Sequence, residues 1–334
     1  MTQKCRKACR LQKGMQATER HEVIMKIQLS DHFDYKRLLR FVAPSILMLL
    51  CTSVYSIVDG FFVSNFVGKT PFAALNLVMP VLMGVGTLGF MAGTGGSAVV
   101  SMTLGEGKRK LANEYFSLIV YVTLAVSIVV ALICFALAPQ IALALGANGE
   151  LEADCVRYSR ILFLSTPAFV MQYLFQSFFI AAEKPTLSLK VNVIAGLTNA
   201  VLDYVLIVVF PLGLAGAALA TAAGQIVGGV IPVIYFAGEN NSLLRLGKAK
   251  WNGKVIWQTC MNGSSELVTN LSTSIVGVLY NFQLVEAAGE NGVAAYGIIM
   301  YVDIIFMTLY LGYSLGSAPI VSFHYWAGNH AELK

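Results

Sequence analysis

Long apolar stretches separated by short polar connections make up most of this chain. They fall at roughly 41–67, 72–104, 115–138, 158–181, 187–210, 213–237, 255–285 and 292–326. Each is long enough for a helix to cross about 30 Å of hydrocarbon at about 1.5 Å per residue. The pattern therefore predicts eight membrane-spanning helices, and an all-α polytopic membrane protein.

The composition supports this fold class. Hydrophobic residues make up 57% of the 334 positions and charged residues only 12%, with a mean hydropathy of +0.69, whereas about a quarter of the residues of a soluble domain are charged. A net charge of +5 is also found in nucleic-acid binders. Here ten of the 23 Lys and Arg residues precede residue 41 and most others lie in short connections, so we interpret them as topology signals and expect no nucleic-acid partner.

The basic residues gather in alternate connections. They occur at 108–110, at Lys184 and at 245–254, whereas the other connections contain only Lys69 and several acids. The positive-inside rule predicts a multi-pass plasma-membrane protein with both termini in the cytoplasm. Residues 1–40 resemble no signal peptide, and we interpret them as a cytoplasmic extension, with Met15 or Met25 as alternative starts.

Four acidic residues lie within the predicted spans: Asp59, Asp203, Glu266 and Asp303. A carboxylate in hydrocarbon costs on the order of several kcal/mol, so it is tolerated mainly where it faces a cavity, a partner or an ion path. No Lys or Arg lies deep enough to neutralise these acids. They are candidates for ion or proton binding, and the alternative of satisfied polar positions in a packed bundle weighs more for Glu266 and Asp303.

Asp59 and Asp203 are expected at one depth, because each lies about 12 Å from the external end of its span. Asn199 precedes Asp203 by one helical turn, and Thr221 returns to the same depth on the following span. Carboxylate, amide and hydroxyl oxygens suit Na⁺ or a proton relay. The sequence predicts a cation or proton site built from these four residues, with Asp59 and Asp203 as the candidate Na⁺ ligands.

Motifs for enzymes, cofactors and ATP use are not recognised. The six cysteines and four histidines have no metal-ligand spacing, and there is no GxxxxGK[ST] phosphate loop or readable pair of nucleophile and base. We expect neither an enzyme nor an ATP-driven pump, and no cofactor besides a coupling ion.

An internal repeat relates two parts of the chain. Residues 66–113 align without a gap to 287–334, 221 positions later, with eleven identities that include Gly68, Thr87 and Gly95. Because 221 residues contain six predicted helices, the copies share one orientation, as in transporters built from parallel repeats. The second copy contains two helices, so the chain corresponds to roughly two thirds of a 6+6 protein, either as a fragment or with the partner helices encoded elsewhere.

Pairs of glycines four residues apart predict close helix packing. These pairs are Gly89 and Gly93, Gly224 and Gly228, and Gly312 and Gly316.

Three motifs together resemble the multidrug and toxic compound extrusion (MATE) transporters, over residues 36–334. They are DGFFV at 59–63 before Gly68, NAVLD at 199–203 followed by GAALAT at 216–221, and GSSE at 263–266. The resemblance implies a V-shaped exporter of two six-helix lobes that works by cation-coupled alternating access. The chain would then comprise an extension 1–40, an N-lobe 41–237, an inter-lobe loop 238–254, and the first two helices of an incomplete C-lobe at 255–334.

The resemblance also implies roles for individual residues. Asp59, Asn199, Asp203 and Thr221 match the N-lobe cation or proton site of the family. Glu266 matches an acidic residue of the C-lobe cation site of some members, whose further partners would lie beyond residue 334. Pro44 matches the proline at which the first helix bends, which makes it a candidate hinge, the alternative being a harmless proline of the entry turn.

We therefore expect a secondary active antiporter that exports amphipathic or cationic organic compounds in exchange for Na⁺ or H⁺. Its partners would be small organic substrates and the lipid bilayer, with no obligate protein partner. One alternative is a truncated product that inserts without transporting, or a membrane scaffold. Another is a flippase for a lipid-linked precursor, although the spans lack the positive charge that holds a pyrophosphate.

Overall fold

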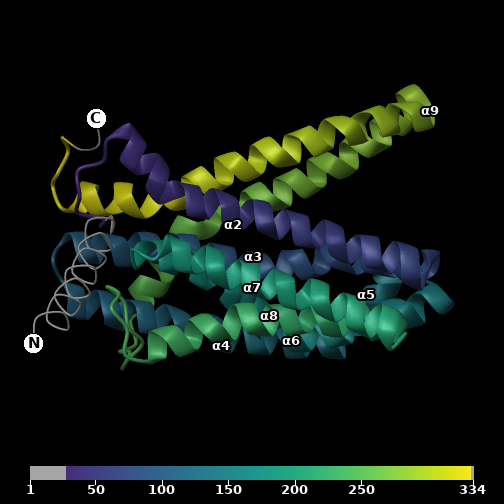
Figure 1. Ribbon diagram of the computed structural model, residues 1–334, viewed down its shortest axis with the longest axis horizontal. Helices are drawn as coiled ribbons and strands as arrows, with labels where there is room; N and C mark the ends of the chain where they lie inside the picture. The colour runs from purple at the N-terminus through teal and green to yellow at the C-terminus, as the bar shows by residue number, and fades with distance from the viewer. Residues whose placement is uncertain (1–27, 332–334) are drawn as a thin grey trace, which may run out of the picture.

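A computed structural model describes residues 28–331, and within them all regular structure is helical (Figure 1). The side chains at 55–57, 69, 73, 270–271, 273–275 and 277–305 lie outside the described part. The elements in chain order are α2 (Tyr35–Phe62), η1 (Val63–Val67), α3 (Lys69–Gly105), α4 (Arg109–Ala136), α5 (Ala138–Ala144), α6 (Glu150–Ala181), α7 (Pro185–Asp203), η2 (Tyr204–Val209), α8 (Gly213–Ala237) and α9 (Gly253–Trp326).

The first six predicted spans are confirmed. Among the described residues, six helices are long and apolar enough to cross a membrane: Tyr35–Val67, Thr70–Gly105, Arg109–Ala136, Glu150–Ala181, Pro185–Val209 and Gly213–Ala237. Three of them begin six to eight residues earlier than predicted, at Tyr35, Arg109 and Glu150, because polar first turns extend the helices beyond their apolar stretches. The short helix α5 and the two π-helical turns η1 and η2 were not predicted.

Local sequence signals explain where these helices begin. The Asp34 carboxylate caps α2 by accepting the Arg37 backbone N–H at 2.7 Å. Gly68, with φ 128°, turns the chain between η1 and α3. Pro185 occupies the first turn of α7, where its missing N–H costs nothing.

Helix α6 is the centre of the six-helix bundle. Buried residues make up 78% of its most apolar window, against 27–50% for the other five spans. It packs against α3, α4 and α8. Phe116 on α4 makes edge-to-face contacts with one ring of α6 and one of α8. The distance between ring centroids is 4.8 Å to Phe178 and 5.1 Å to Phe236. This aromatic core fixes one end of the bundle.

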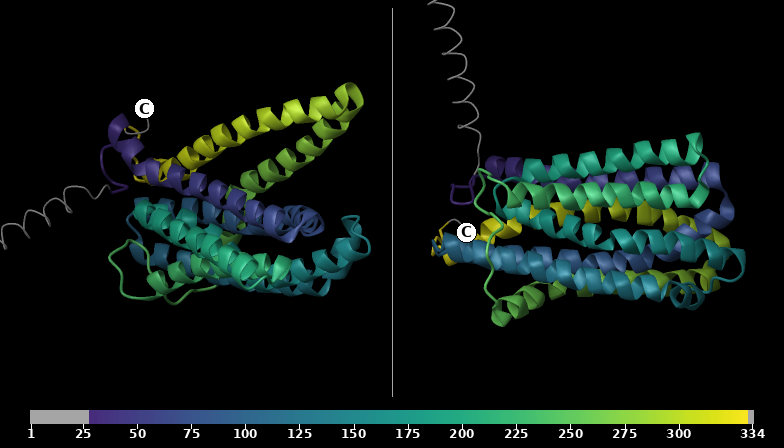
Figure 2. Two further views of the ribbon diagram at one scale, coloured as in Figure 1. Left: turned by 45° about the vertical axis from the view of Figure 1, so that its right-hand side comes forward. Right: turned by 90° about the horizontal axis from the view of Figure 1, so that it is seen from below.

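Helix α9 doubles back on itself. Its 74 residues run away from the bundle and then return, so that its last turn lies at the same end as the first turn of α2 (Figures 1 and 2). The predicted separation into 255–285 and 292–326 was wrong in one respect, because the connection between the two arms is also helical. No proline occurs between 253 and 318 to interrupt the backbone hydrogen bonds.

The two arms of α9 pack on the bundle in a way that supports the internal repeat. A Cβ on Gly95 of α3 would collide with the backbone at Thr259 and Gly263 of the first arm, and one on Gly316 of the second arm would lie 2.8 Å from Val42 of α2. An offset of 221 residues relates Gly95 to Gly316 and Val42 to Gly263. One packing contact therefore occurs twice, as a parallel repeat requires.

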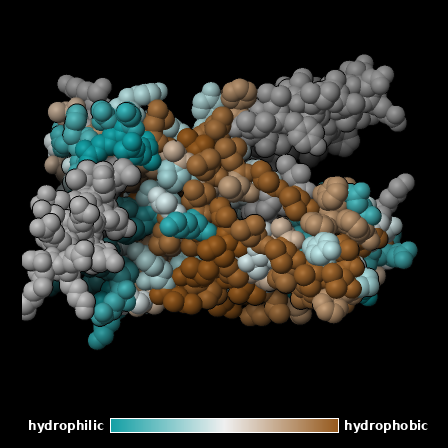
Figure 3. Space-filling model, in the orientation of Figure 1, coloured by the Kyte–Doolittle hydropathy of each residue, from teal (hydrophilic) through white to brown (hydrophobic). Residues whose placement is uncertain are grey.

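The apolar surface forms a belt across the middle of the molecule. Figure 3 shows hydrophobic residues between two more polar ends. Many large apolar side chains on this belt are exposed, among them Leu132, Leu197 and Ile234 at 60% or more. Such a surface is expected to face lipid tails.

The predicted role of the paired glycines is confirmed. A Cβ on Gly89 would collide with the Val170 carbonyl of α6, one on Gly228 would lie 2.6 Å from Gln172 Cδ, and one on Gly312 would lie 2.6 Å from Ile46 Cα. These are contacts that only a residue without a side chain allows.

We predict that Gly89→Ala lowers the thermal unfolding midpoint of the purified protein by several degrees, since α3 and α6 must separate to admit the methyl group. Gly84→Ala on the same helix is the matched control, because nothing lies within 4 Å of its added Cβ. The control should be neutral or stabilising by up to about 1 kcal/mol, through helix propensity. Equal midpoints for the two variants would contradict the packing role.

Candidate cation or proton site

Both membrane aspartates stand where an α-helix changes into a π-helical turn. Asp59 lies in the last turn of α2, just before η1, and Asp203 is the last residue of α7, just before η2. A π-helical turn widens the backbone and re-aims the side chains beside it, and such turns are frequent at functional sites. The backbone is thus irregular in both helices next to the acids.

The two carboxyl groups meet inside the bundle, which is consistent with the common depth predicted from the sequence. The Asp59 and Asp203 side chains contact one another, and Asp59 also contacts the Thr221 hydroxyl. Asp59 is 4% exposed and Asp203 is fully buried. Neither has a cationic partner among the described residues.

Several oxygen atoms of this cluster accept no hydrogen bond from the described residues. Asp59 Oδ1, both Asp203 oxygens and Asn199 Oδ1 are buried without a hydrogen-bond partner in the described part of the chain. Ionised carboxylates only accept hydrogen bonds, so two that face one another leave their oxygens unsatisfied. A proton shared between them, or a cation coordinated by their oxygens, would remove this cost.

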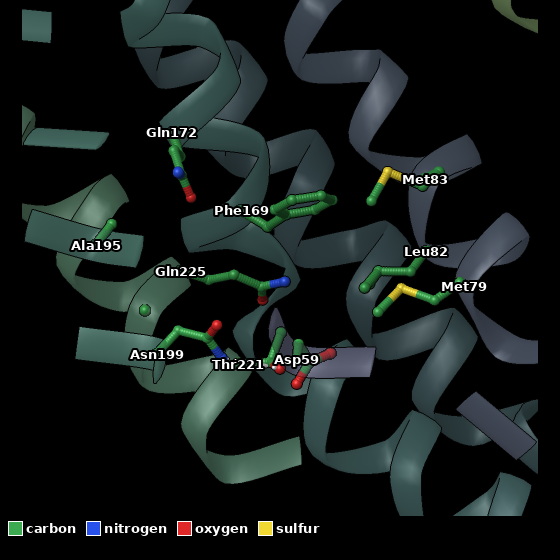
Figure 4. A pocket seen from close by; sticks show the side chains of 11 residues that line it. Asp59, Met79, Leu82, Met83, Phe169, Gln172, Ala195, Asn199, Thr221 and Gln225 are labelled. Carbon is green, nitrogen blue, oxygen red and sulfur yellow. Dashed lines mark hydrogen bonds between the residues drawn. The ribbon is translucent and has the colours of Figure 1, made fainter. Parts of the chain in front are cut away.

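A small cavity opens beside Asp59. It encloses about 40 Å³, enough for an ion or a few waters. Figure 4 shows Asp59 next to Thr221, with Asn199 on the neighbouring helix and Met79, Leu82 and Met83 of α3 facing them. Asp203 is not among the residues that line the cavity.

Close approach of α7 and α8 holds the neutral members of the site. Asn199 Nδ2 donates to Thr221 Oγ1 at 3.5 Å. One turn after Thr221, a Cβ on Gly224 would lie 3.0 Å from the Ala195 carbonyl and 3.1 Å from Asn199 Cβ. Glycine at this position allows Thr221 and Asn199 to reach the acids. The structure therefore brings together all four residues predicted from the sequence.

Tyr158 is an additional member that was not predicted. Its side chain is completely buried, its hydroxyl has no hydrogen-bond partner within the described residues, and it lies near Asp59, Asp203 and Thr221. The apolar pattern placed Tyr158 at the mouth of a span, but α6 begins eight residues earlier, at Glu150. Those two extra turns carry Tyr158 into the bundle.

Two further polar side chains that line the cavity, Gln172 and Gln225, are hydrogen-bonded to neighbouring side chains. Gln225 Oε1 accepts the Ser165 hydroxyl at 2.6 Å, and Gln172 Nε2 donates to Asn192 Oδ1 at 3.1 Å. These pairs are satisfied by one another. Gln172 and Gln225 thus add to the polar lining of the cavity that also contains Asp59.

The remaining predicted residues lie elsewhere. Glu266 is half-buried on the first arm of α9 and does not line this cavity, and the Asp303 side chain lies outside the described residues. Pro44 is the tenth residue of α2, in the helix interior. The entry-turn alternative for Pro44 is therefore wrong, and the proline removes one backbone hydrogen bond from α2.

The oxygen ligands suit a hard monovalent cation or a proton. Within the described residues no group of three His, Cys, Asp or Glu side chains could hold a metal ion. Two carboxyl groups, an amide and hydroxyls instead offer the oxygen chemistry that hard cations prefer. The fold and the site together define a multi-pass helical membrane protein with a buried pair of acidic side chains.

Known membrane transporters resemble this chain in sequence and in structure. The MatE family model matches residues 44–205. The multidrug export protein MepA of Staphylococcus aureus (strain N315) is 26% identical over 306 residues, which cover 90% of this chain and 66% of MepA. MepA of Staphylococcus haemolyticus (strain JCSC1435) is likewise 26% identical, over 305 residues. The chain thus spans slightly less than two thirds of the length of these relatives.

Solved structures share the fold. A crystal structure of a MATE protein in complex with MaD3S superimposes with a TM-score of 0.85 at 21% identity, covering 90% of this chain and 68% of that one. An outward-facing multidrug resistance MATE transporter gives a TM-score of 0.78 at 21% identity, with 89% and 66% coverage. The chain therefore shares the fold of the MATE transporters, and the MatE family model matches slightly less than half of it.

We predict that Asp203→Asn raises the thermal unfolding midpoint at neutral pH. The new amide would donate to an Asp59 oxygen that now has no donor, a gain of about 1–2 kcal/mol. Asp154→Asn, near the beginning of α6, is the control and should leave the midpoint unchanged. A lower midpoint for Asp203→Asn would mean that the carboxylate makes a stabilising contact, contrary to the unsatisfied oxygens described above.

Proposed function

We propose that this chain carries the ion-coupling site of a secondary active exporter of amphipathic or cationic organic compounds. The observation that carries the proposal is the pair of facing carboxyl groups at Asp59 and Asp203 beside an ion-sized cavity. Three of their four oxygens have no hydrogen-bond donor in the described part of the chain. Relatives of this chain are named multidrug export proteins. Na⁺ or H⁺ would be the coupling ion.

The cavity supports ion binding and not drug binding in this conformation. Sites for organic ligands usually enclose about 300–1,000 Å³, whereas the space beside Asp59 is about 40 Å³. An organic substrate would therefore bind in a different conformation or at a different surface. Coupling requires only that ion and substrate prefer different states of the protein.

Charge favours this function over a lipid-precursor flippase. No Lys or Arg lines the cavity, so nothing there would hold a pyrophosphate. The basic residues instead gather at the end of the bundle where α4 and α9 begin. We infer that this end faces the cytoplasm, and that α2 begins and α9 ends on that side of the plasma membrane.

We predict that Asp59→Asn and Asp203→Asn abolish dye efflux from cells that express the chain, because an amide can neither carry the proton nor neutralise the cation. Asp154→Asn should export at the rate of the unsubstituted chain. Efflux is measured by dye fluorescence, with the Na⁺ and pH gradients collapsed separately to identify the coupling ion.

Equal surface amounts of all variants, checked by immunoblot, are needed to separate transport from folding. Efflux at the unsubstituted rate in either aspartate variant would refute the coupling role. Efflux that survives collapse of both gradients would refute cation coupling altogether.

A further inference from the structure

The connection between α8 and α9, residues 238–252, lies along the outside of α4 as an extended strap. At its beginning, Arg109 Nη2 donates to the Ser242 carbonyl at 2.9 Å, and Arg109 Nε to the Leu243 carbonyl at 3.3 Å. One turn further along α4, Asn113 Oδ1 accepts the Arg245 backbone N–H at 3.0 Å. These side chains of α4 hold the strap by its backbone.

Two further hydrogen bonds attach the strap to α4, farther from the N-terminus of the helix. Ser117 Oγ accepts the Gly247 N–H at 3.0 Å, and the Tyr121 hydroxyl donates to the Gly247 carbonyl at 3.0 Å. Bonds at positions 109, 113, 117 and 121 follow one face of the helix, because residues four apart lie above one another. The strap therefore follows a defined path on the bundle.

The strap has an apolar inner side and a basic outer side. Leu244 is fully buried, and Leu246 and Ala249 pack against the same core. Arg245, Lys248 and Lys250 alternate with them and are exposed. The backbone bonds to α4 thus orient three positive charges away from the protein.

The beginning of α9 extends this basic surface. Lys254 is exposed, as are Trp251 at 77% and Trp257 at 67%. Within the described residues, no acidic side chain lies within ion-pairing distance of Arg245, Lys248, Lys250 or Lys254. The positive charge of this surface is therefore not neutralised by the fold.

The length of α4 places the strap at the level of the lipid headgroups. Its 28 residues span about 42 Å at 1.5 Å per residue, about 12 Å more than the hydrocarbon core. The charged residues of α4 all lie near its N-terminus: Arg109, Lys110 and Glu114. The extra length of the helix therefore projects from the hydrocarbon core at its N-terminal end. Gly247 is bonded to Ser117 and Tyr121, which lie about 12 and 18 Å beyond Arg109, so the strap reaches from the headgroup level to the edge of the hydrocarbon core. The strap covers this projecting part.

We propose that the strap and the first turn of α9 bind the headgroups of anionic phospholipids in the adjacent leaflet. Arg and Lys side chains at this level reach phosphate while their stems lie along apolar surface. Trp251 and Trp257 supply the indole rings that favour the same interface. The strap joins the six-helix bundle to α9, so bound lipid acts on the connection between them. This inference does not depend on the proposed transport function.

Tryptophan quenching tests this proposal directly. The chain has three tryptophans, so Trp326→Phe in the full 334-residue protein leaves only Trp251 and Trp257 to report. The protein is reconstituted into phosphatidylcholine vesicles in which an equal share of either phosphatidylglycerol or phosphatidylcholine carries acyl chains brominated near the headgroup. We expect brominated phosphatidylglycerol to be enriched at the strap by roughly fivefold over brominated phosphatidylcholine.

Matched variants distinguish lipid binding at the strap from a general effect of positive charge on the protein. Lys248→Gln with Lys250→Gln should bring the quenching ratio towards one, whereas Arg157→Gln with Arg160→Gln, at the opposite end of the bundle, should leave it unchanged. Added salt should lower the ratio of the unsubstituted strap without any substitution that could affect folding. Equal quenching by the two lipids, or a ratio that the lysine variant does not change, would overturn the proposal.

Discussion

Every polar group inside the hydrocarbon of a bilayer must find its partner within the protein, and this constraint shapes the whole molecule. Helices satisfy the backbone, and most hydroxyls in the spans bond to a carbonyl one turn back, as Thr87 does to Met83 and Thr166 to Leu162. The carboxyl groups of Asp59 and Asp203 break the pattern. They are buried against each other, and three of their four oxygens have no hydrogen-bond donor within the described residues. A shared proton or a bound cation would remove the cost of this arrangement.

The bundle is built so that this expensive pair can persist. Close packing through Gly89 and Gly228 leaves little room for rearrangement around α6. Gly224 brings α8 close to α7, where the side chains of Asn199 and Thr221 are hydrogen-bonded to one another. The irregular turns η1 and η2 follow directly after the two acids. In the proposed exporter, these two irregular segments beside a rigid core would be the elements that change arrangement when the ion binds and leaves.

Much of this arrangement was predictable from the sequence. Apolar length gave the six spans of the bundle, and helix geometry gave the common depth of Asp59 and Asp203, because both depend on local spacing. The π-helical turns were not predictable, since they arise from packing and have no residue signature in VSNFV or YVLIVV. Tyr158 was missed because the start of α6 is set by polar residues at 150–154, which an apolar pattern does not register.

Infrared difference spectroscopy of the reconstituted chain would observe the carboxyl pair itself. A carboxylic-acid C=O stretching band should be present at low pH without Na⁺. It should be lost when the pH is raised or Na⁺ is added, and it should be missing from the variant with both Asp59→Asn and Asp203→Asn. The same difference band in that double variant, or no band that responds to pH or Na⁺ in the unsubstituted chain, would show that the cation or proton binds elsewhere.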